Sequence, residues 1–597
     1  MVELFRALIH RPRLAAFLLG LTIAFYLHFP AFVNPYRFNE DWRQAPHWTN
    51  PAGHSFRRGD FLYEYAEFNT PPLNNTIYPL LSYLGGAILW GKILAVLYHG
   101  LTVLAIFVTA RSLSTDRKVG DLSGAAAALV YTFFPTQFYW FSGAYGHALM
   151  PLFCCLALLI IHRKRYWLAL PLMAFEAVAY PSAAVFTGAY FLIEAILSDY
   201  RWIFQKDFWT RKALPLLVAA VAGFLVLSVK YLEPHPEYGE LAGWKEISAN
   251  WIAYTSKGRY PVLPVRSVWR VLGREWGDIF HVAVFLVALL VLKRDALRIP
   301  RPLLALLAAS LGVYLAAYLF LMKLYIPNRY VRYPLPVFTA VLSGLWLGRA
   351  GAALGVKTVR VRIGAVALAL LGFLVFGHKA RAGMATKVYD RVELYRTIRS
   401  LPGRPLIISH PDIGDEIPLM TGRSILVSEE FAHPWWSEVW DTMTVRIHDF
   451  FRMYYATDTP TVAAFFERYG GDALIVDRRH FRRKYLRRGK FLFEPFNTWV
   501  RDNLSPGRES LVRRIPEEYR LYDGRRCFLV TKEALFAFLA TVPGDTGAVA
   551  SRTEEDEKGR GTVRTREQRG RPPKHAEGLD TPPPAVTEKS GDVYDDF

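Results

Sequence analysis

Two adjacent acidic residues near the start of the chain are the first candidates for chemistry. The stretch RFNEDWRQ, residues 37–44, contains Glu40 and Asp41 and follows the first long apolar run. Neighbouring carboxylates repel each other, which favours one of them acting as a base or holding a cation. Arg43 lies two residues beyond Asp41, where it could orient one acid or position an anionic substrate. Acidic pairs also occur commonly in solvated surface loops. The surrounding sequence therefore has to distinguish a reactive site from an ordinary loop.

Four basic residues are candidates for binding an anion such as phosphate. Lys92 opens a later apolar run, and Lys323, Arg329 and Arg332 flank the segment between two others. Such side chains also anchor helix ends by reaching to the membrane surface, and this alternative is favoured for Lys323. For Arg329 and Arg332 an anion clamp is favoured, because Lys and Arg are otherwise depleted on the outer side of a membrane.

A cofactor or metal is not indicated by the sequence. EPHPEYGE, residues 233–240, offers Glu233, His235 and Glu237, which are residue types that can ligate a divalent ion. Their close spacing around two prolines fits no standard site, so a polar loop is favoured. The chain contains neither a P-loop nor a G-x-G-x-x-G stretch, so a nucleotide site is not expected. We expect no cofactor, and a divalent metal is compatible with the chain without being indicated.

The elements that must position these residues are membrane-spanning helices. The chain has 597 residues, of which 52% are hydrophobic. Its apolar blocks are roughly 15 to 22 residues long, enough to cross a hydrocarbon core of about 30 Å. We predict a polytopic α-helical membrane protein with about eleven crossings, with Tyr166–Leu197 counted as two helices that meet at Pro181. The predicted spans are Leu14–Phe29, Leu89–Ala110, Leu122–Trp140, Ala144–Ile161, Tyr166–Leu197, Ala213–Leu232, Ile279–Leu292, Leu303–Met322, Pro334–Leu347 and Ile363–Phe376.

Charge distribution predicts the orientation of these spans. The formal net charge is +20, and the Lys and Arg clusters between the apolar blocks fall on one side of the membrane if the count is right. That side is expected to be cytoplasmic, which places the N-terminus inside and everything after Phe376 outside. The dispersed basic residues suit loops that flank a membrane better than a nucleic-acid partner. We therefore expect a multi-pass protein of the cell inner membrane.

This orientation divides the chain into three parts. Residues 1–378 form the transmembrane part, with long outer loops at 30–88 and 233–278. Residues 379–544 form an extracytoplasmic α/β domain, because short β-rich runs at 405–409, 424–428, 473–478 and 526–531 accompany a helical stretch at 459–470. Residues 545–597 have almost no apolar side chains and are predicted to be a disordered tail. Within the first loop, residues 59–86 are expected to form an amphipathic helix on the membrane surface or a plain connecting loop.

Several of these features together resemble a known family. The acidic pair after the first span, the PPL run with its apolar helix before GKILAVLYHGLTVLAIFVTARSL (91–113), and YIPNRYVRYPLPVFTAVLSGLW (325–346) resemble polyprenyl-phosphate-sugar-dependent glycosyltransferases of the GT-C fold. Examples are the protein mannosyltransferase-like and aminoarabinose transferase-like enzymes. The resemblance covers roughly residues 10 to 540 in layout.

The resemblance implies a function and assigns roles to the candidate residues. An inverting enzyme would move a sugar from a polyprenyl-phosphate donor to a lipid, glycan or protein acceptor on the outer face of the membrane. The family's catalytic acid falls on Asp41 or Glu40, and the order Glu-Asp leaves that choice open, with Asp41 favoured. Lys92, Lys323, Arg329 and Arg332 would bind the donor phosphate, and Arg43 would position substrate. The alternatives are a transporter or flippase, or a polymerase or ligase, for a lipid-linked glycan.

Overall fold

The computed structural model describes residues 11–49, 56–114, 116–132, 143–198, 213–231, 235–259, 290–292, 294–320, 324, 326–355, 386–507 and 509–543. The chain divides into a first unit, Met1–Val542, and a second unit, Pro543–Phe597. Only the first unit is discussed below. The predicted tail at 545–597, the span Ile363–Phe376, most of the span Ile279–Leu292 and residue Lys323 lie outside the described residues.

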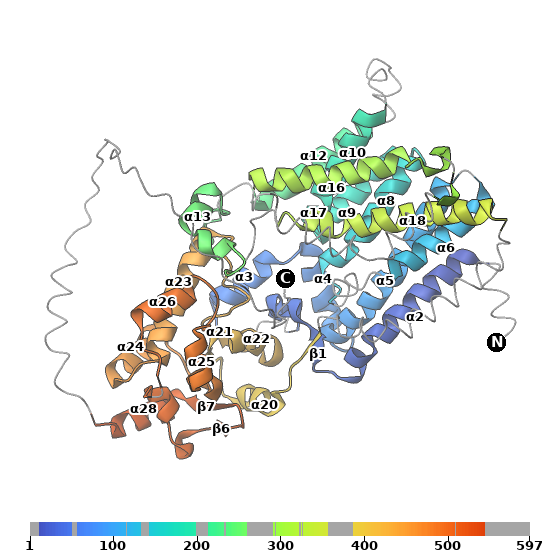
Figure 1. Cartoon of the computed structure of the whole chain (residues 1–597). Coiled ribbons are helices and arrows are strands. Elements are labelled where there is room, and N and C mark those ends of the chain that lie inside the picture. Colours follow the sequence, from blue (N-terminus) through green and yellow to red (C-terminus); the bar gives the residue numbers. More distant parts are fainter. Residues whose placement is uncertain are drawn as a thin grey trace, which may run out of the picture. The chain divides into compact units, whose positions relative to one another are not determined.

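Long apolar helices dominate the first part of the chain (Figure 1). Within the described residues, four helices are long and apolar enough to cross a membrane. They are α2 (Pro12–Val33), α5 (Ala87–Leu113), α16 (Arg301–Phe320) and the run Arg329–Ala353, which combines α17 (Arg329–Arg332) and α18 (Pro334–Ala353). Shorter helices accompany them: α6 (Arg117–Thr132), α8 (Met150–His162), α9 (Ala169–Ala179), α10 (Pro181–Ser198) and α12 (Leu214–Tyr231). The membrane-protein class is confirmed, whereas the count of eleven crossings stays a prediction.

Small residues allow the apolar helices to approach closely. A side chain added at Gly344 of α18 would lie 2.5 Å from Cβ of Ala127, which belongs to α6. At Gly348, one turn later, it would lie 2.2 Å from Oγ of Ser123. Close backbone contact through small residues is a common way for helices to associate in lipid, where hydrophobic burial gives little driving force. The contact fixes α18, whose N-terminal end carries part of the candidate site.

The predicted break at Pro181 is confirmed. Helix α9 ends at Ala179, Tyr180 is extended, and α10 begins with Pro181, because proline cannot donate a helical hydrogen bond but suits a first helical position. Polar side chains hold the neighbouring helices together. Thr187 donates a hydrogen bond of 2.9 Å to Glu176, and Glu194 lies 3.6 Å from Arg301. Both acids therefore pair helices, as the sequence favours for acids inside apolar blocks.

The segment at residues 30–88, which the sequence predicts to lie outside the membrane and which we call the first outer loop, is made of short elements in its described part. They are β1 (Arg37–Asn39), η1 (Glu40–Gln44), η2 (Pro46–Trp48), α3 (Phe61–Asn69) and α4 (Pro72–Ser82). The helix expected within residues 59–86 is present, but it is divided into α3 and α4. Asp60 caps α3 by accepting from the backbone N–H groups of Leu62 and Tyr63, and Pro71 and Pro72 stop that helix from continuing.

The C-terminal part of the first unit contains a five-stranded mixed sheet in the order β4-β3-β5-β7-β6. Strand β3 (Leu406–Ile408) is parallel to β4 (Ser424–Ile425) and β5 (Ala473–Asp477). Strand β7 (Cys527–Thr531) is antiparallel to β5 and to β6 (Tyr522–Asp523).

The four predicted strands are present, as is the predicted helix, α24 (Thr459–Tyr469). Helices cover the sheet, namely α20 (Val392–Ser400), α22 (Glu416–Thr421), α23 (Ser437–Tyr454), α26 (Phe496–Asn503) and α28 (Lys532–Thr541). All residues of β3, β4 and β5, and all but the last of β7, are buried, as a sheet covered by helices requires.

The first outer loop and the C-terminal part share a backbone connection. Strand β1 pairs antiparallel with β2 (Thr386–Val388), with Asn39 opposite Thr386. In addition, Phe38 stacks on Tyr389 with ring centroids 4.3 Å apart. Strand β2, which leads into the C-terminal part, is therefore held directly beside the acidic pair. The stacked rings of Phe38 and Tyr389 are both buried by this contact.

Candidate functional site

The backbone around Asp41 is held in place by local hydrogen bonds. The Asn39 side chain accepts a hydrogen bond of 2.7 Å from the Asp41 N–H and so caps η1. The indole of Trp42 donates one of 3.0 Å to the carbonyl of Gly143. These contacts bring the turn that carries Asp41 against the segment that precedes α8. Nothing is described for the side chain of Glu40.

Asp41 faces a histidine from this second segment. Nε2 of His147 lies 3.7 Å from Oδ2 of Asp41, and the two side chains are 5% and 17% exposed. His147 belongs to η3 (Gly146–Leu149), where a side chain at Gly146 would lie 2.2 Å from the carbonyl oxygen of Ala179. Only glycine fits that position, so the backbone beside α9 fixes the imidazole next to the carboxylate.

A tyrosine and an arginine extend this group toward α18. The ring of Tyr333 stacks on that of His147, with centroids 5.8 Å apart and planes inclined by 15°. Arg329 lies one helical turn earlier, and its guanidinium donates a hydrogen bond to the Tyr333 hydroxyl. Asp41, His147, Tyr333 and Arg329 therefore form one group, which we call the Asp41 cluster.

The cluster places a possible base beside a fixed positive charge. A carboxylate can take a proton from a hydroxyl or amine, while a guanidinium can bind a phosphate through two parallel hydrogen bonds. Both groups lie where a helix meets a loop, beside apolar helices. The arrangement is suited to a reaction in which one substrate loses a proton and another departs as an anion.

Arg43 is placed differently from the sequence expectation. Its guanidinium lies 3.0 Å from Asp415 and 2.8 Å from Glu430, both in the C-terminal part. Arg259, from the second outer loop, lies 3.0 Å from the same Glu430. Burial raises the pKa of Asp415, and the charge of Arg43 opposes that rise. Arg43 thus joins the first loop to the C-terminal sheet, and its side chain is directed at protein carboxylates.

The side chain of Lys92 also binds to groups of the protein itself. Its ammonium donates hydrogen bonds of 2.6 Å to the carbonyl of Ala31 and 3.2 Å to that of Asn34. These carbonyls belong to the end of α2, where the last groups of a helix have no partner within the helix. The structure therefore joins Arg329 to Asp41 through Tyr333 and His147 but places Lys92 on the end of α2.

Two members of the Asp41 cluster were not selected from the sequence as site residues. His147 lies in GAYGHALM, and Tyr333 lies in the stretch YIPNRYVRYPLPVFTAVLSGLW (325–346) that carries the family resemblance. Two features of the sequence point to these residues. His147 lies in a glycine-containing turn, and Tyr333 follows Arg329 by four residues. Neither signal names its partner, because Asp41, His147 and Tyr333 come from three separate apolar segments.

The chain is similar to known proteins in structure only. No family model matches the chain, and no curated protein sequence matches it. Among solved structures, the chain is similar to an oligosaccharyltransferase of Archaeoglobus fulgidus in complex with Zn and sulfate, with a TM-score of 0.47 and 14% identity over 80% of this chain and 69% of that one.

A second solved structure is similar over most of its length. It is ArnT from Cupriavidus metallidurans bound to undecaprenyl phosphate, with a TM-score of 0.41 and 13% identity over 89% of this chain and 98% of that one. Both proteins are glycosyltransferases of the GT-C fold, the family that the sequence resembles. Because these TM-scores lie below 0.5, we base the function on this chain's own residues.

Proposed function

We propose that this protein is an integral membrane glycosyltransferase that moves a sugar from a polyprenyl-phosphate donor to a lipid, glycan or protein acceptor. The observation that carries the proposal is the contact between Asp41 and His147, with Arg329 hydrogen-bonded to Tyr333 in the same cluster. An acid and an arginine meet there at the ends of apolar helices. A donor with a lipid tail would bring its phosphate to such a boundary, with the tail along the helices.

Asp41 is proposed to act as the base of the transfer step. Its carboxylate takes the proton from the acceptor hydroxyl or amine as the oxygen or nitrogen attacks C1 of the sugar. The bond between C1 and the phosphate oxygen breaks, and its electron pair leaves with the polyprenyl phosphate. Attack opposite the leaving group inverts the configuration at C1. His147 holds the Asp41 carboxylate in position through its contact and is a positioning residue.

Arg329 and Arg332 are proposed to stabilise the departing phosphate. Negative charge increases on that group as the bond to C1 breaks, so a fixed guanidinium favours the transition state over the bound substrate. The hydrogen bond from Arg329 to Tyr333 and the position of its guanidinium carbon 5.8 Å from the centre of the Tyr333 ring hold the charge before substrate arrives. Little reorganisation is then needed during the reaction.

The proposal is tested by incubating purified protein with radiolabelled polyprenyl-phosphate sugars and a membrane lipid extract. Transfer of label to an acceptor by the wild-type protein, and its loss in Asp41→Asn, would support a glycosyltransferase. Glu67→Gln is the matched control, because Glu67 is an exposed acid of the same outer loop. Movement of intact donor across vesicles without any transfer would instead identify a flippase and overturn the proposal.

A further inference from the structure

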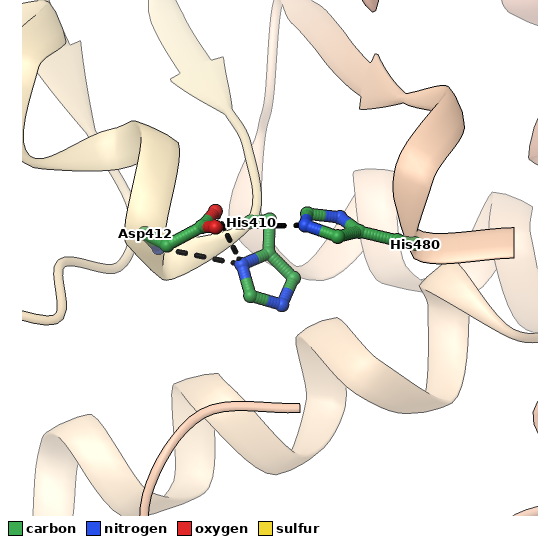
Figure 2. Close-up of side chains that lie close together, drawn as sticks. All are labelled: His410, Asp412 and His480. Atoms are coloured by element: carbon green, nitrogen blue, oxygen red, sulfur yellow. Dashed lines mark hydrogen bonds and ion pairs between the residues drawn. The ribbon is translucent and has the colours of Figure 1, made fainter. Parts of the chain in front are cut away.

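A second group of chemically capable side chains lies in the C-terminal sheet, apart from the Asp41 cluster. His410 follows strand β3, Asp412 lies in α21 (Pro411–Gly414), and His480 lies in η10 (Arg478–Phe481), directly after strand β5. Because β3 and β5 are parallel neighbours, their carboxyl ends meet at the same edge of the sheet. Figure 2 shows the three side chains directed toward one another from these two loops. This edge is where α/β sheets commonly bind ligands.

The distances between the three side chains fit a metal ion. Nδ1 of His410 lies 2.7 Å from one oxygen of Asp412, and Nε2 of His480 lies 3.5 Å from the other. One potential ligand atom from each residue lies within 4.8 Å of the others. Ligand atoms around tetrahedral zinc, with bonds of about 2.0 to 2.2 Å, are roughly 3.3 to 3.6 Å apart. Small side-chain rotations would therefore bring all three into a coordination shell.

Burial distinguishes this group from an ordinary surface cluster. The side chains of His410 and His480 are each 1% exposed, whereas that of Asp412 is 35% exposed. Nε2 of His480 makes one contact, of 3.5 Å, with Oδ2 of Asp412, and the described residues offer it no closer hydrogen-bond partner. A buried polar nitrogen held by so long a contact is poorly compensated for its lost hydration. An ion between Nε2 and Asp412 would bind both atoms, and the exposed side of Asp412 gives it a route from solvent.

Neighbouring residues orient the histidine for this role. The hydroxyl of Tyr454 lies 3.2 Å from Nδ1 of His480. This contact holds the His480 ring with Nε2 directed at Asp412. Outer partners that fix the tautomer and ring of a ligating histidine are a regular feature of metal sites.

The charge balance of the site is compatible with a divalent ion. Arg479 lies 3.8 Å from Asp412, but its guanidinium is held more closely by Asp477, at 2.8 Å. Asp477 is shared by Arg479 and Arg526, which lies 3.1 Å from it, so Asp412 is the carboxylate of this group that an ion can bind. Imidazole ligands favour zinc over magnesium and calcium, which prefer oxygen ligands.

We propose that His410, Asp412 and His480 form a zinc site that ties α21 to η10. Zinc would bridge the loops that follow β3 and β5, with solvent at the fourth position. Asp415, which receives Arg43 from the first outer loop, comes directly after α21. The ion would therefore stiffen the edge of the sheet to which that loop is attached. The site does not depend on the proposed glycosyl transfer and can be tested without it.

The test measures zinc retained by the full-length protein, purified in detergent with an affinity tag that contains no histidine. After chelator treatment, reloading with zinc and dialysis, bound metal is measured by atomic emission and by competition with a chromogenic chelator. The wild-type protein is expected to retain about one zinc per chain, because two buried histidines and one carboxylate supply three protein ligands. His480→Gln and Asp412→Asn are expected to lose at least about tenfold in zinc affinity, the range seen when a ligand or its partner is removed.

His448→Gln is the matched control. His448 is another histidine of the same sheet region, and its ring stacks on Trp499 with centroids 3.9 Å apart. This variant should retain zinc as the wild type does, and far-UV circular dichroism checks the folding of each variant. Because Asp412 is partly exposed, Asp412→Asn keeps the test valid if His480→Gln fails to fold. Zinc that is absent from the wild type, that stays in Asp412→Asn, or that is lost only in Asp41→Asn would each overturn the proposal.

Discussion

Nε2 of His147 lies 3.7 Å from a carboxylate oxygen of Asp41, although the two residues come from the loops before two different apolar helices. The contact depends on Gly146, which alone lets η3 approach the carbonyl of Ala179. The contact with His147 orients the Asp41 carboxylate. The roles proposed for the Asp41 cluster lead to the following predictions.

Removing the basicity of Asp41 should abolish most of the activity. Asp41→Asn keeps the size of the side chain, so expression and thermal melting should stay close to those of the wild type. Turnover should fall at least about a hundredfold, the lower range for loss of a general base. Glu40→Gln should be milder if Glu40 only assists. If Asp41→Asn turned over as fast as the control Glu67→Gln, Glu40 and Asp41 would have no catalytic role and would be an ordinary solvated pair of acids.

Removing Arg329 should weaken the use of the lipid donor. In Arg329→Ala the phosphate loses a bidentate partner, so donor kcat/KM should fall roughly ten- to a hundredfold, as one lost charged contact to a developing anion does. Arg329→Lys should restore only part of it, because an ammonium lacks the planar fork. Tyr333→Phe removes the hydroxyl that accepts from Arg329 and should have an intermediate effect. Donor kinetics unchanged in Arg329→Ala would make this arginine structural.

Lys92 tests whether a basic residue at a helix end acts on substrate or on the protein. Lys92→Gln should lower the melting temperature, because the carbonyls of Ala31 and Asn34 lose their donor. The KM for the donor should not change, since the ammonium is directed at the end of α2. A raised donor KM with an unchanged melting temperature would assign Lys92 to phosphate binding after all.

Arg43 should govern stability in a pH-dependent way. Arg43→Ala leaves Asp415 and Glu430 buried with less positive charge and should cost about 3 to 5 kcal/mol. Burial raises the folded-state pKa of Asp415, and Arg43 opposes that rise, so the pKa is higher still in the variant. An acid whose folded-state pKa is raised stabilises the fold at low pH and loses that contribution as pH rises through the folded-state pKa. The deficit should therefore be largest at neutral pH and shrink on acidification.

Denaturation of both proteins across this pH range measures the effect. Arg452→Ala is the control, because Arg452 is 55% exposed and pairs with Asp449 at the surface. Such an exposed pair contributes about 1 kcal/mol or less, so its loss should be small at every pH. A deficit in Arg43→Ala that stays constant, or grows on acidification, would contradict the assigned cause.

Reporter fusions test the predicted orientation. Fusions after Ser114 and Lys164 should report a cytoplasmic location, and fusions after Glu240 and Asp390 should report an extracytoplasmic one, because the basic clusters lie on the cytoplasmic side. The contacts of Arg43 and Arg259 with Glu430 require both outer loops and the C-terminal part to share a side. A cytoplasmic signal at Asp390 with an extracytoplasmic one at Glu240 would contradict this.

The sequence alone determined the features that depend on local composition and period. Apolar blocks identified the membrane class because their length matches a hydrocarbon core. Pro181 marked the junction of α9 and α10, since proline cannot donate a helical hydrogen bond but suits the first position of a helix. The strands β3, β4, β5 and β7 were recognisable because each is a short run of apolar, mostly β-branched residues. Asp41 could be selected for the same reason, as an acid placed directly after an apolar run.

Only the tertiary structure decided which side chains meet. His147 and Tyr333 join Asp41, and Arg43 pairs with Asp415, across segments that are far apart in sequence. His410 and Asp412 meet His480 because β3 and β5 are neighbours in a parallel sheet. Such contacts depend on how helices and strands pack, and packing is set by close approach at positions such as Gly146 and Gly344. No local pattern carries that information, because each partner is specified by the whole fold.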